Sequence, residues 1–407
     1  MKDLKNIKKC RICKSSDLKI VLELYKTPIG ENFNLKKKNN KFFNLDLFQC
    51  SSCGLCQLKQ VINPKLLYEK YLYQSYTSVG LKNHFEDYSK KVSKYLSIKK
   101  NDLVVDIGSN DGMLLKSFKK SYYRVLGIEP AKKISIVANK NGINTINSYF
   151  NEKTTSKILK NYGNPRLVTA NNVLANVDNI KNWIINIKKL IKDEGFFVFE
   201  SFSLRDVIKN KVIDFIYHEH LSIFSTKSIK YLCESNNLKL FNVERVTTKG
   251  GSLRYYICSQ HNKININKNV KKMLSLEIKD KCFNKKTFEE LKKKINLNRL
   301  KLNKIIDKNC NNIIGLGASI SCITLMYQLN IADKVNYLLD DNKLKHGMYS
   351  PGSNIKIYDP KKFKYNKNQT LLILAWRFKK FFLKKYSSKF KGEIYNIWPN
   401  QEKIKND

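Results

Sequence analysis

The segment Tyr217-His218-Glu219-His220 gathers side chains that could move a proton, in a chain with only five histidines. An imidazole takes up and releases protons near neutral pH. Glu219 could orient an imidazole or stabilise its charged form, and Tyr217 could donate a hydrogen bond to a developing oxyanion. The two histidines supply only two metal ligands, so the cluster favours acid–base chemistry over a metal site. Histidines that bond only to loop carbonyls are the alternative.

Four of the ten cysteines form two close pairs, Cys10-x-x-Cys13 and Cys50-x-x-Cys53. Two such turns that come together make a tetrahedral cage of thiolates, the ligand set of many structural zinc ions. Because four thiolates leave no open coordination position, we expect this zinc to stabilise the fold rather than catalyse. Four unrelated buried cysteines are the alternative, and Cys56 is a spare thiol nearby.

A glycine turn follows the first strongly apolar strand that the sequence predicts. Asp106 ends that strand, Gly108 allows a tight turn, and Gly112 lets a helix begin close by. Backbone N–H groups at such a helix N-terminus can receive a nucleotide-type ligand. Glu129 ends the next strand, 21 residues after Gly108. A carboxylate at that place can accept hydrogen bonds from both hydroxyls of a ribose.

The residues inside this turn indicate which nucleotide it suits. Asn110 and Asp111 put polar side chains where dinucleotide-binding turns have a glycine that approaches a pyrophosphate. A cofactor with a ribose and a charged amino-acid tail, but no pyrophosphate, fits this pattern. The sequence therefore predicts S-adenosylmethionine rather than NAD, and a turn without any ligand is the alternative.

A second glycine turn, Gly315-x-Gly317, lies near the end of the chain. Asp340 follows 23 residues after Gly317 and ends another predicted strand. This carboxylate could hold the ribose of a nucleotide, or the turn could be an empty copy of the same fold. A lone Gly-x-Gly does not decide between them.

Apolar strands and amphipathic helices must position these side chains. They alternate through the middle of the chain, which predicts a doubly wound parallel sheet. The expected elements are a helix over 84–100, a strand, turn and helix over 103–118, strands within 123–131, 166–177 and 194–202, and a helix over 183–191.

A lysine-rich stretch from 265 to 308 has no glycine or proline and predicts a long helix or a helix pair between domains. The strand and helix alternation then restarts with 311–329, 334–342 and 369–376. A second α/β domain is therefore expected to follow the connector.

The net charge of +43 arises from 77 lysines and arginines against 34 acidic residues. Most of the excess is lysine spread along the whole chain, so runs such as 36–38 and 384–385 are interpreted as solvated surface rather than a nucleic-acid patch. The sequence shows no apolar run of membrane-spanning length and no signal peptide at its start. We therefore expect a cytoplasmic protein with its thiols free or bound to metal.

Several of these segments resemble, in order, motifs of one family. This is the zinc-containing, S-adenosylmethionine-dependent C-methyltransferases that act on nucleotide-linked keto-sugars in deoxysugar biosynthesis. The matching segments are CRIC (10–13), NLDLFQCSSCGLCQL (44–58), VVDIGSNDGMLL (104–115), GIEPA (127–131), ANNVLANV (170–177), IYHEHLSIFS (216–225), GGSLRYYI (250–257), GLGASISCITL (315–325), LLDDNKLKHGMYSPGSNIKI (338–357) and LAWRF (374–378).

The resemblance implies a division of the chain into four parts. These are a four-cysteine zinc-binding module over 1–70, a Rossmann-like methyltransferase domain over 71–264, a helical connector over 265–308, and a Rossmann-like nucleotide-sugar-binding domain over 309–407. It also implies transfer of a methyl group to a ring carbon next to the ketone of a keto-hexose, through an enolate.

The resemblance assigns roles to residues of the site as well. His220 is implied as the base, with Tyr217 and Glu219 as its neighbours and either Tyr71 or Tyr73 near the sugar. The cofactor contacts that it implies are Gly108, Asn110, Asp111, Glu129 and Asn172, beside Asp106 and Gly112 of the turn itself. The chain departs from some members at Asn176, where they have a histidine, and at Ser321, where they have a lysine that could pair with a diphosphate.

Two other functions compete with this one. The net charge and the zinc module suit a methyltransferase that acts on RNA or protein, although no basic and aromatic strip supports nucleic-acid binding. A non-catalytic nucleotide-sugar-binding protein is the other alternative, and the intact set of Gly108, Gly112 and Glu129 argues against it. The sequence does not indicate which sugar, nucleotide or carbon is used, or whether the chain is a monomer or a dimer.

Overall fold

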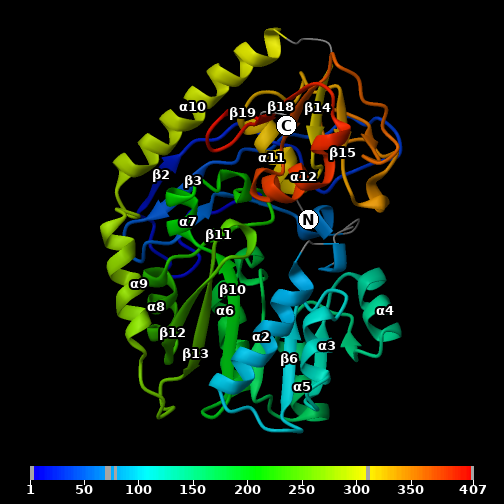
Figure 1. The fold of residues 1–407 in the computed structure, drawn as a ribbon. Helices are drawn as coiled ribbons and strands as arrows, with labels where there is room; N and C mark the ends of the chain where they lie inside the picture. The colour runs from blue at the N-terminus through cyan, green and yellow to red at the C-terminus, as the bar shows by residue number, and fades with distance from the viewer. Residues whose placement is uncertain (1–3, 69–74, 78–79, 309–311, 405–407) are drawn as a thin grey trace.

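The computed structural model describes residues 4–68, 75–77, 80–308 and 312–404. Within these ranges the strands form four sheets of two, four, seven and six strands, surrounded by helices (Figure 1). The mixed α/β fold expected from the alternating strands and helices is confirmed.

The N-terminal part forms two small antiparallel sheets. One pairs β1 (Leu4–Asn6) with β5 (Gln60–Ile62), and α1 (Pro64–Tyr68) follows. The other has the order β11-β4-β3-β2, with β2 (Leu18–Leu22), β3 (Leu47–Cys50), β4 (Cys56–Leu58) and β11 (Ser222–Ile223). Strand β11 begins two residues after His220, so the YHEH segment is tied directly to the cysteine-rich module.

The central sheet has the order β12-β13-β10-β9-β6-β7-β8. Its strands are β6 (Leu103–Ile107), β7 (Arg124–Ile128), β8 (Thr145–Ile146), β9 (Leu167–Thr169), β10 (Phe196–Phe202), β12 (Leu238–Val246) and β13 (Ser252–Ser259). Strands β10, β9, β6, β7 and β8 run parallel, as expected for a doubly wound sheet. Strand β13 runs antiparallel to both β10 and β12, because only a short turn joins it to β12.

Helices cover both faces of this sheet. Alternate side chains of β6 point to opposite faces, so Val104 packs in a core with α2 (Leu81–Tyr95) and α3 (Met113–Lys119), and Val105 packs with α5 (Glu152–Tyr162) and α6 (Ile180–Ile191). Burying each such aliphatic side chain contributes about 1.5–3 kcal/mol. The remaining helices of this part are α4 (Lys132–Lys140), α7 (Leu204–Lys209) and α8 (Thr226–Glu234).

Two helices, α9 (Lys268–Lys279) and α10 (Lys285–Lys308), occupy the lysine-rich stretch. Of the two alternatives predicted for this stretch, the helix pair is confirmed and the single long helix is wrong. Figure 1 shows α10 running along one side of the molecule toward the six-stranded sheet.

The six-stranded sheet has the order β16-β15-β14-β17-β18-β19. Its elements are β14 (Ile313–Leu316), α11 (Ile320–Gln328), β15 (Tyr337–Leu339), β16 (Ile357–Tyr358), β17 (Thr370–Ile373), α12 (Lys379–Tyr386), β18 (Glu393–Asn396) and β19 (Glu402–Ile404). We call the sheet and its helices, residues 312–404, the C-terminal unit.

Short 3₁₀ turns connect many of these elements. They are η1 (Ser75–Thr77), η2 (Leu174–Asn176), η3 (Ile213–Phe215), η4 (Thr248–Gly250), η5 (Lys343–Lys345), η6 (Trp376–Phe378) and η7 (Ser387–Lys389). Turn η3 matters most for the site, because it immediately precedes the YHEH segment.

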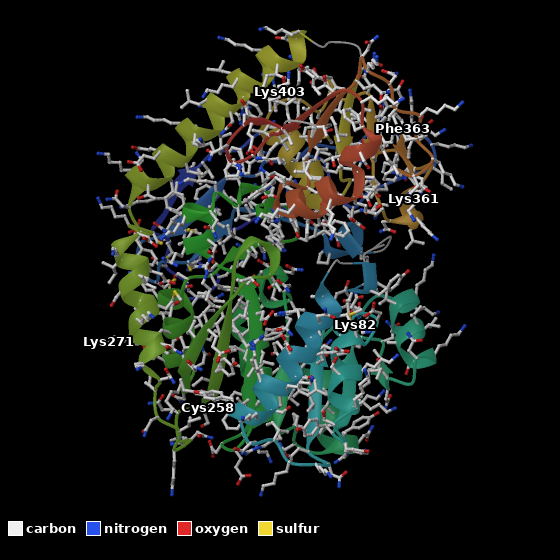
Figure 2. All side chains as sticks on the ribbon, viewed as in Figure 1. Lys82, Cys258, Lys271, Lys361, Phe363 and Lys403 are labelled. Carbon is white, nitrogen blue, oxygen red and sulfur yellow. The ribbon has the colours of Figure 1, made fainter. Side chains whose placement is uncertain are left out.

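The excess of lysine lies on the surface. Figure 2 shows long side chains projecting around the outline of the molecule, with Lys82 of α2, Lys271 of α9, Lys403 of β19 and Lys361 of a turn labelled. The run 36–38 is exposed, as predicted for solvated surface, whereas Lys385 of the run 384–385 is half-buried and pairs with Asp341. Among the described helices, none has the length and apolar character needed to cross a membrane.

Candidate active site

The turn after β6 depends on backbone conformations that favour glycine. Gly108, Asn110 and Gly112 have φ of 69°, 51° and 79°. A Cβ atom at Gly108 would lie 2.4 Å from Cγ2 of Val173, which leaves no room for a side chain. Helix α3 begins directly after Gly112, so the turn presents backbone N–H groups at a helix N-terminus.

Glu129 holds this turn from the end of the neighbouring strand β7. Its Oε2 accepts a hydrogen bond from the N–H of Asn110 over 3.0 Å, and its Oε1 accepts one from the N–H of Ala131 over 2.8 Å. The side chain is buried, and burial raises its pKa. Glu129 therefore lies at the predicted place, with both oxygens already bound to backbone.

Asp106 and Asn172 complete the carboxyl edge of the parallel strands. The hydroxyl of Thr169 donates to Oδ1 of Asp106 over 2.6 Å, and burial raises the pKa of Asp106 to about 7. Asn172 has a φ of 59°, and its N–H donates to the carbonyl oxygen of Glu200 over 2.7 Å. Both residues follow or end a strand, so the sheet sets their positions.

The side chains of Asn110 and Asp111 fasten a neighbouring segment onto the turn. Oδ1 of Asn110 accepts from the N–H of Ser75 over 2.9 Å, and Oδ2 of Asp111 accepts from the N–H of Tyr76 over 3.0 Å. These contacts give a second reason for polar residues in the turn, because they cover it with the segment that precedes α2.

A cavity of about 350 Å³ lies over the turn. It is lined by residues of the predicted cofactor set, namely Asp106, Gly108, Asn110, Glu129 and Asn172. The same cavity is also lined by Tyr217, Glu219 and His220. Ile320, the first residue of α11, also reaches it, so the C-terminal unit closes part of the wall. Asp111 and Gly112 lie behind the turn and are absent from the described lining.

His220 is the histidine that faces this cavity. Its Nδ1 lies 2.7 Å from the carbonyl oxygen of Phe215, an acceptor that requires the proton to be on Nδ1. The ring stacks on Tyr217, with ring centroids 4.0 Å apart, and lies 4.6 Å from the ring of Phe202. The imidazole is therefore held in one orientation, with the lone pair of the neutral ring on Nε2.

Glu219 lines the same cavity and is almost completely buried. Neither of its carboxylate oxygens has a hydrogen-bond partner among the described residues. Burial raises its pKa to about 7, and the nearby charge of Glu31 adds to the shift. Asn176, also in the cavity wall, has a buried Oδ1 without a described partner. Buried polar atoms that lack a protein partner and line a cavity indicate that the cavity binds a polar ligand.

His218 lies on the other side of the segment and holds the N-terminal part in place. Its Nε2 is 3.0 Å from Oγ1 of Thr27 and 3.2 Å from the carbonyl oxygen of the same residue. Its ring meets Phe43 edge to face, and burial lowers its pKa to about 4. The structural alternative, a buried histidine that only satisfies groups of a loop, therefore applies to His218. His220 also bonds a loop carbonyl, but its ring lines the cavity.

The expected sugar-side tyrosines, Tyr71 and Tyr73, lie outside the described residues.

The second glycine turn, Gly315-x-Gly317, repeats the hydrogen-bond arrangement of the first. Oδ2 of Asp340 accepts from the N–H of Ala318 over 2.6 Å, and its Oδ1 accepts from the N–H of Asn342 over 2.8 Å. Ser321 is the second residue of α11, and its hydroxyl accepts a hydrogen bond from Arg377 over 3.1 Å.

Three segments of the chain match models of known protein families. Residues 81–243 match the family model "Methyltransferase domain", residues 247–397 match "C-methyltransferase C-terminal domain", and residues 10–68 match "Putative zinc binding domain". Across 379 residues the chain is 27% identical to the C-methyltransferase NovU of Streptomyces niveus, a match that covers 91% of this chain and 90% of that protein.

The chain is an S-adenosylmethionine-dependent C-methyltransferase. Two solved methyltransferase structures are also similar to it. Magnesium protoporphyrin IX methyltransferase from Synechocystis PCC 6803 is 13% identical with a TM-score of 0.35, covering 44% of this chain and 83% of that one. The plantazolicin methyltransferase BpumL is 13% identical with a TM-score of 0.37, covering 46% and 87%.

The four cysteines of the methyltransferase fit a structural zinc ion. Their sulfur atoms all lie within 4.8 Å of one another, with Cys10 and Cys53 at 3.6 Å and Cys13 and Cys50 at 3.4 Å. Four sulfurs at about 2.3 Å from one tetrahedral ion would be about 3.8 Å apart. A hydrogen bond from Cys53 lowers the pKa of Cys10 to about 5, which favours the thiolate needed for binding.

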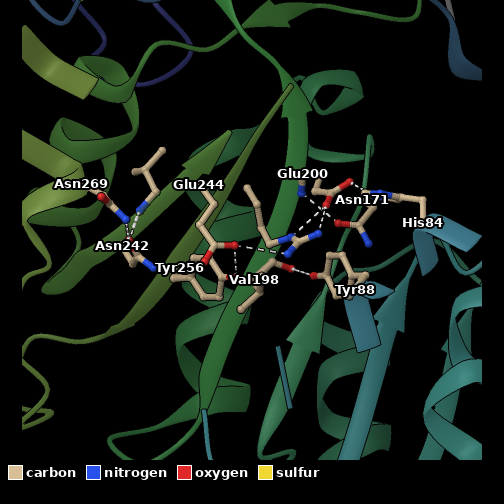
Figure 3. Close-up of polar contacts among 11 residues, drawn as sticks. His84, Tyr88, Asn171, Val198, Glu200, Asn242, Glu244, Tyr256 and Asn269 are labelled. Atoms are coloured by element: carbon tan, nitrogen blue, oxygen red, sulfur yellow. Dashed lines mark hydrogen bonds and ion pairs between the residues drawn. The ribbon is translucent and has the colours of Figure 1, made fainter. Parts of the chain in front are cut away.

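One polar network of the methyltransferase was not predicted. Glu200, near the end of β10, bonds to His84 over 2.7 Å and to Nη2 of Arg254 over 2.7 Å (Figure 3). Its N–H donates to Oδ1 of Asn171, a residue of the cavity wall. Burial raises the pKa of Glu200, but His84 and Arg254 outweigh it and lower the pKa overall. A glutamate inside the apolar stretch FFVFESF was the available signal, because a buried charge needs a partner.

Proposed function

We propose that this methyltransferase acts on a nucleotide-linked keto-hexose and transfers a methyl group to the ring carbon next to the ketone. The observation that carries the proposal is one cavity shared by the first glycine turn and by Tyr217, Glu219 and His220. A methyl donor bound at the turn and a ketone bound beside the imidazole would then be neighbours. Such placement of two reactants supplies much of the rate of an enzyme.

His220 is proposed as the base that removes the proton from carbon. Since its Nδ1–H is committed to the carbonyl oxygen of Phe215, Nε2 is the atom that accepts the proton. The C–H electron pair becomes a C=C bond to the ketone carbon, and the C=O π pair moves onto oxygen to give an enolate. When the enolate carbon bonds to the methyl group, the C–S bond of the donor would break, its electron pair would stay on sulfur, and S-adenosylhomocysteine would leave. The carbonyl of Phe215 also stabilises the imidazolium that results, because the Nδ1–H bond strengthens when the ring is charged.

Glu219 and Tyr217 are proposed to act on the developing oxyanion and on the charge of the ring. With a pKa of about 7, Glu219 holds its proton for much of the time at neutral pH. A protonated carboxyl can donate a hydrogen bond to an enolate oxygen, and a tyrosine hydroxyl can do the same. Once ionised, Glu219 would instead stabilise the imidazolium. Tyr71 or Tyr73 remains the proposed tyrosine near the sugar.

S-adenosylmethionine, when bound, supplies an electrophilic methyl group on a sulfonium. The residues proposed to hold it are those of the first turn and its neighbours. Gly108 and Asn110 offer backbone, Glu129 offers the remaining lone pairs of its carboxylate to ribose hydroxyls, and Asn172 offers an amide. The C-terminal unit, which reaches the cavity at Ile320, is proposed to hold the nucleotide of the sugar substrate.

The deciding experiment combines turnover with proton exchange. The purified enzyme is incubated with S-adenosylmethionine and a panel of nucleotide-linked 4-keto-hexoses, and products are analysed by mass spectrometry for the gain of one methyl group. The same sugars are incubated in D₂O without the methyl donor. We expect one sugar to be methylated and to exchange the hydrogen next to its ketone. Methylation of RNA or protein but of no keto-sugar would overturn the proposal.

A further inference from the structure

The loop that carries His220 is held by the C-terminal unit. The indole N–H of Trp398 donates to the carbonyl oxygen of Lys211 over 2.6 Å, at the start of this loop. A little further along, the carboxylate of Asp214 forms an ion pair with the guanidinium of Arg377. Trp398 and Asp214 are almost completely buried, and Arg377 is 10% exposed. Two side chains distant in the sequence thus fasten η3 from outside.

Arg377 also touches the residue that orients the imidazole. Its Cζ lies 4.4 Å from the ring centroid of Phe215, a cation–π contact. The carbonyl oxygen of Phe215 accepts the Nδ1–H of His220 over 2.7 Å, and the two rings lie nearly parallel at 5.8 Å. The contacts therefore run without a break from the C-terminal unit, through Arg377 and Phe215, to the imidazole.

The surroundings of Arg377 are built to keep it in this place. A Cβ atom at Gly250 would lie 2.6 Å from Cδ of Arg377, so the arginine stem occupies space that any other residue at 250 would need. Nη2 of Arg377 donates to the hydroxyl of Ser321 over 3.1 Å, which joins the same guanidinium to α11. A lysine has one charged nitrogen and could not make this fork of contacts.

We propose that Arg377 is a positioning residue for His220, and that it couples the placement of the C-terminal unit to the orientation of the base. It is proposed to act through Asp214 and Phe215, and it is not among the described residues that line the cavity. The inference rests on the proposed role of His220 as the base. Its consequence is that the imidazole is aligned for proton removal only while the C-terminal unit is docked on η3.

The kinetic test compares Arg377→Gln and Arg377→Lys with Lys379→Gln as a matched control. Lys379 lies two residues after Arg377 in the sequence, and its ion-pair partner is Glu402 of β19. We expect Arg377→Gln to lower kcat about 100-fold, as a misplaced reacting group does. The Kd of S-adenosylmethionine should change less than threefold in all variants. Arg377→Lys should recover part of the loss, and Lys379→Gln should keep wild-type kcat.

A second measurement reads the imidazole directly. The chain is labelled with ¹⁵N-histidine, and the His220 signals are assigned by their loss in His220→Gln. Wild-type protein should show the Nδ1-protonated tautomer of neutral His220, whereas Arg377→Gln should show a mixture of tautomers. A double variant, Asp214→Asn with Arg377→Gln, removes both charges from the buried pair. It should fold as wild type does, yet show the tautomer mixture and the reduced kcat.

The outcomes separate this inference from the proposed function. Full turnover in His220→Gln would overturn the role of the base, and the tautomer measurement would still test the contact of Arg377. An inactive His220→Gln together with wild-type kcat and a single tautomer in Arg377→Gln would overturn the inference alone. A folded double variant with wild-type kcat would overturn it as well.

Discussion

His220 donates its Nδ1–H to the carbonyl oxygen of Phe215 over 2.7 Å, and this contact decides which ring nitrogen carries the proton. The acceptor is a backbone atom of η3, so no side-chain rotation can remove it. The lone pair of the neutral ring is consequently on Nε2, in a residue that lines the cavity. If His220 is the base, as proposed, this contact leaves Nε2 as the nitrogen that takes up the proton.

Replacement of His220 should abolish methyl transfer without abolishing cofactor binding. His220→Gln removes the proposed proton acceptor, so kcat should fall at least about 1,000-fold, within the range of a lost general base. The Kd of S-adenosylmethionine, measured by titration calorimetry, should stay within threefold. His218→Gln is the matched control in the same segment. It should lower the free energy of unfolding by about 1–3 kcal/mol through the contact with Thr27, while folded enzyme remains active.

Glu219 should make stability fall as pH rises toward neutrality. Burial raises its pKa from 4.5 to about 7, so folding favours the protonated carboxyl. The stability that this preference adds is complete below about pH 4.5 and is lost as pH rises through 7. In Glu219→Gln the loss should be absent, so relative to wild type the variant gains up to about 3 kcal/mol between pH 5 and 8. Denaturant unfolding at several pH values measures this difference. If the free energy of unfolding changed with pH in the same way in wild type and in Glu219→Gln, the prediction would be contradicted.

Glu129 should control the affinity for S-adenosylmethionine. Glu129→Gln replaces one acceptor oxygen by a donor, which breaks one of the bonds to the N–H groups of Asn110 and Ala131 and weakens ribose binding. We expect the Kd to rise about 10- to 100-fold. Asp340→Asn makes the equivalent change in the second turn and should leave this Kd unchanged. Equal losses in both variants would show that the first turn is not the cofactor site.

Loss of zinc should destabilise the protein and disturb the YHEH segment. Cys13→Ser removes one of the four sulfur ligands, so metal content should fall and the Tm should drop by several degrees. Because β11 pairs with β4, kcat should also decline, although the cluster has no place in the chemistry. Cys56→Ser is the control. Because Cys56 is outside the cluster, this variant should keep the metal. Elemental analysis and calorimetry decide between these outcomes, and unchanged zinc in Cys13→Ser would refute the site.

Much of the local structure could be predicted from spacing alone. The glycine turn, its flanking strands and the acid at the end of β7 follow from a pattern of apolar residues and glycines that only one backbone conformation satisfies. The four cysteines likewise came together as their pairing indicated. These features depend on residues close in the chain, or on ligand types with one common geometry, so the sequence carries their signal directly.

The different roles of His218 and His220 could not be predicted in the same way. Only Glu219 separates them in the sequence, and both are buried. What distinguishes them is Thr27 on one side and the cavity on the other, and both come from packing between distant segments. The same holds for Arg377, which meets Asp214 across 163 positions of sequence.

The sequence by itself determined the α/β class, the four-cysteine cluster and the glycine turn after β6, because short-range backbone preferences and side-chain types decide these. Only the tertiary structure decided which histidine faces the cavity and which side chains of the C-terminal unit hold its loop. Those contacts depend on how separately folded sheets pack against one another, and a pattern of neighbours along the chain carries no record of that packing.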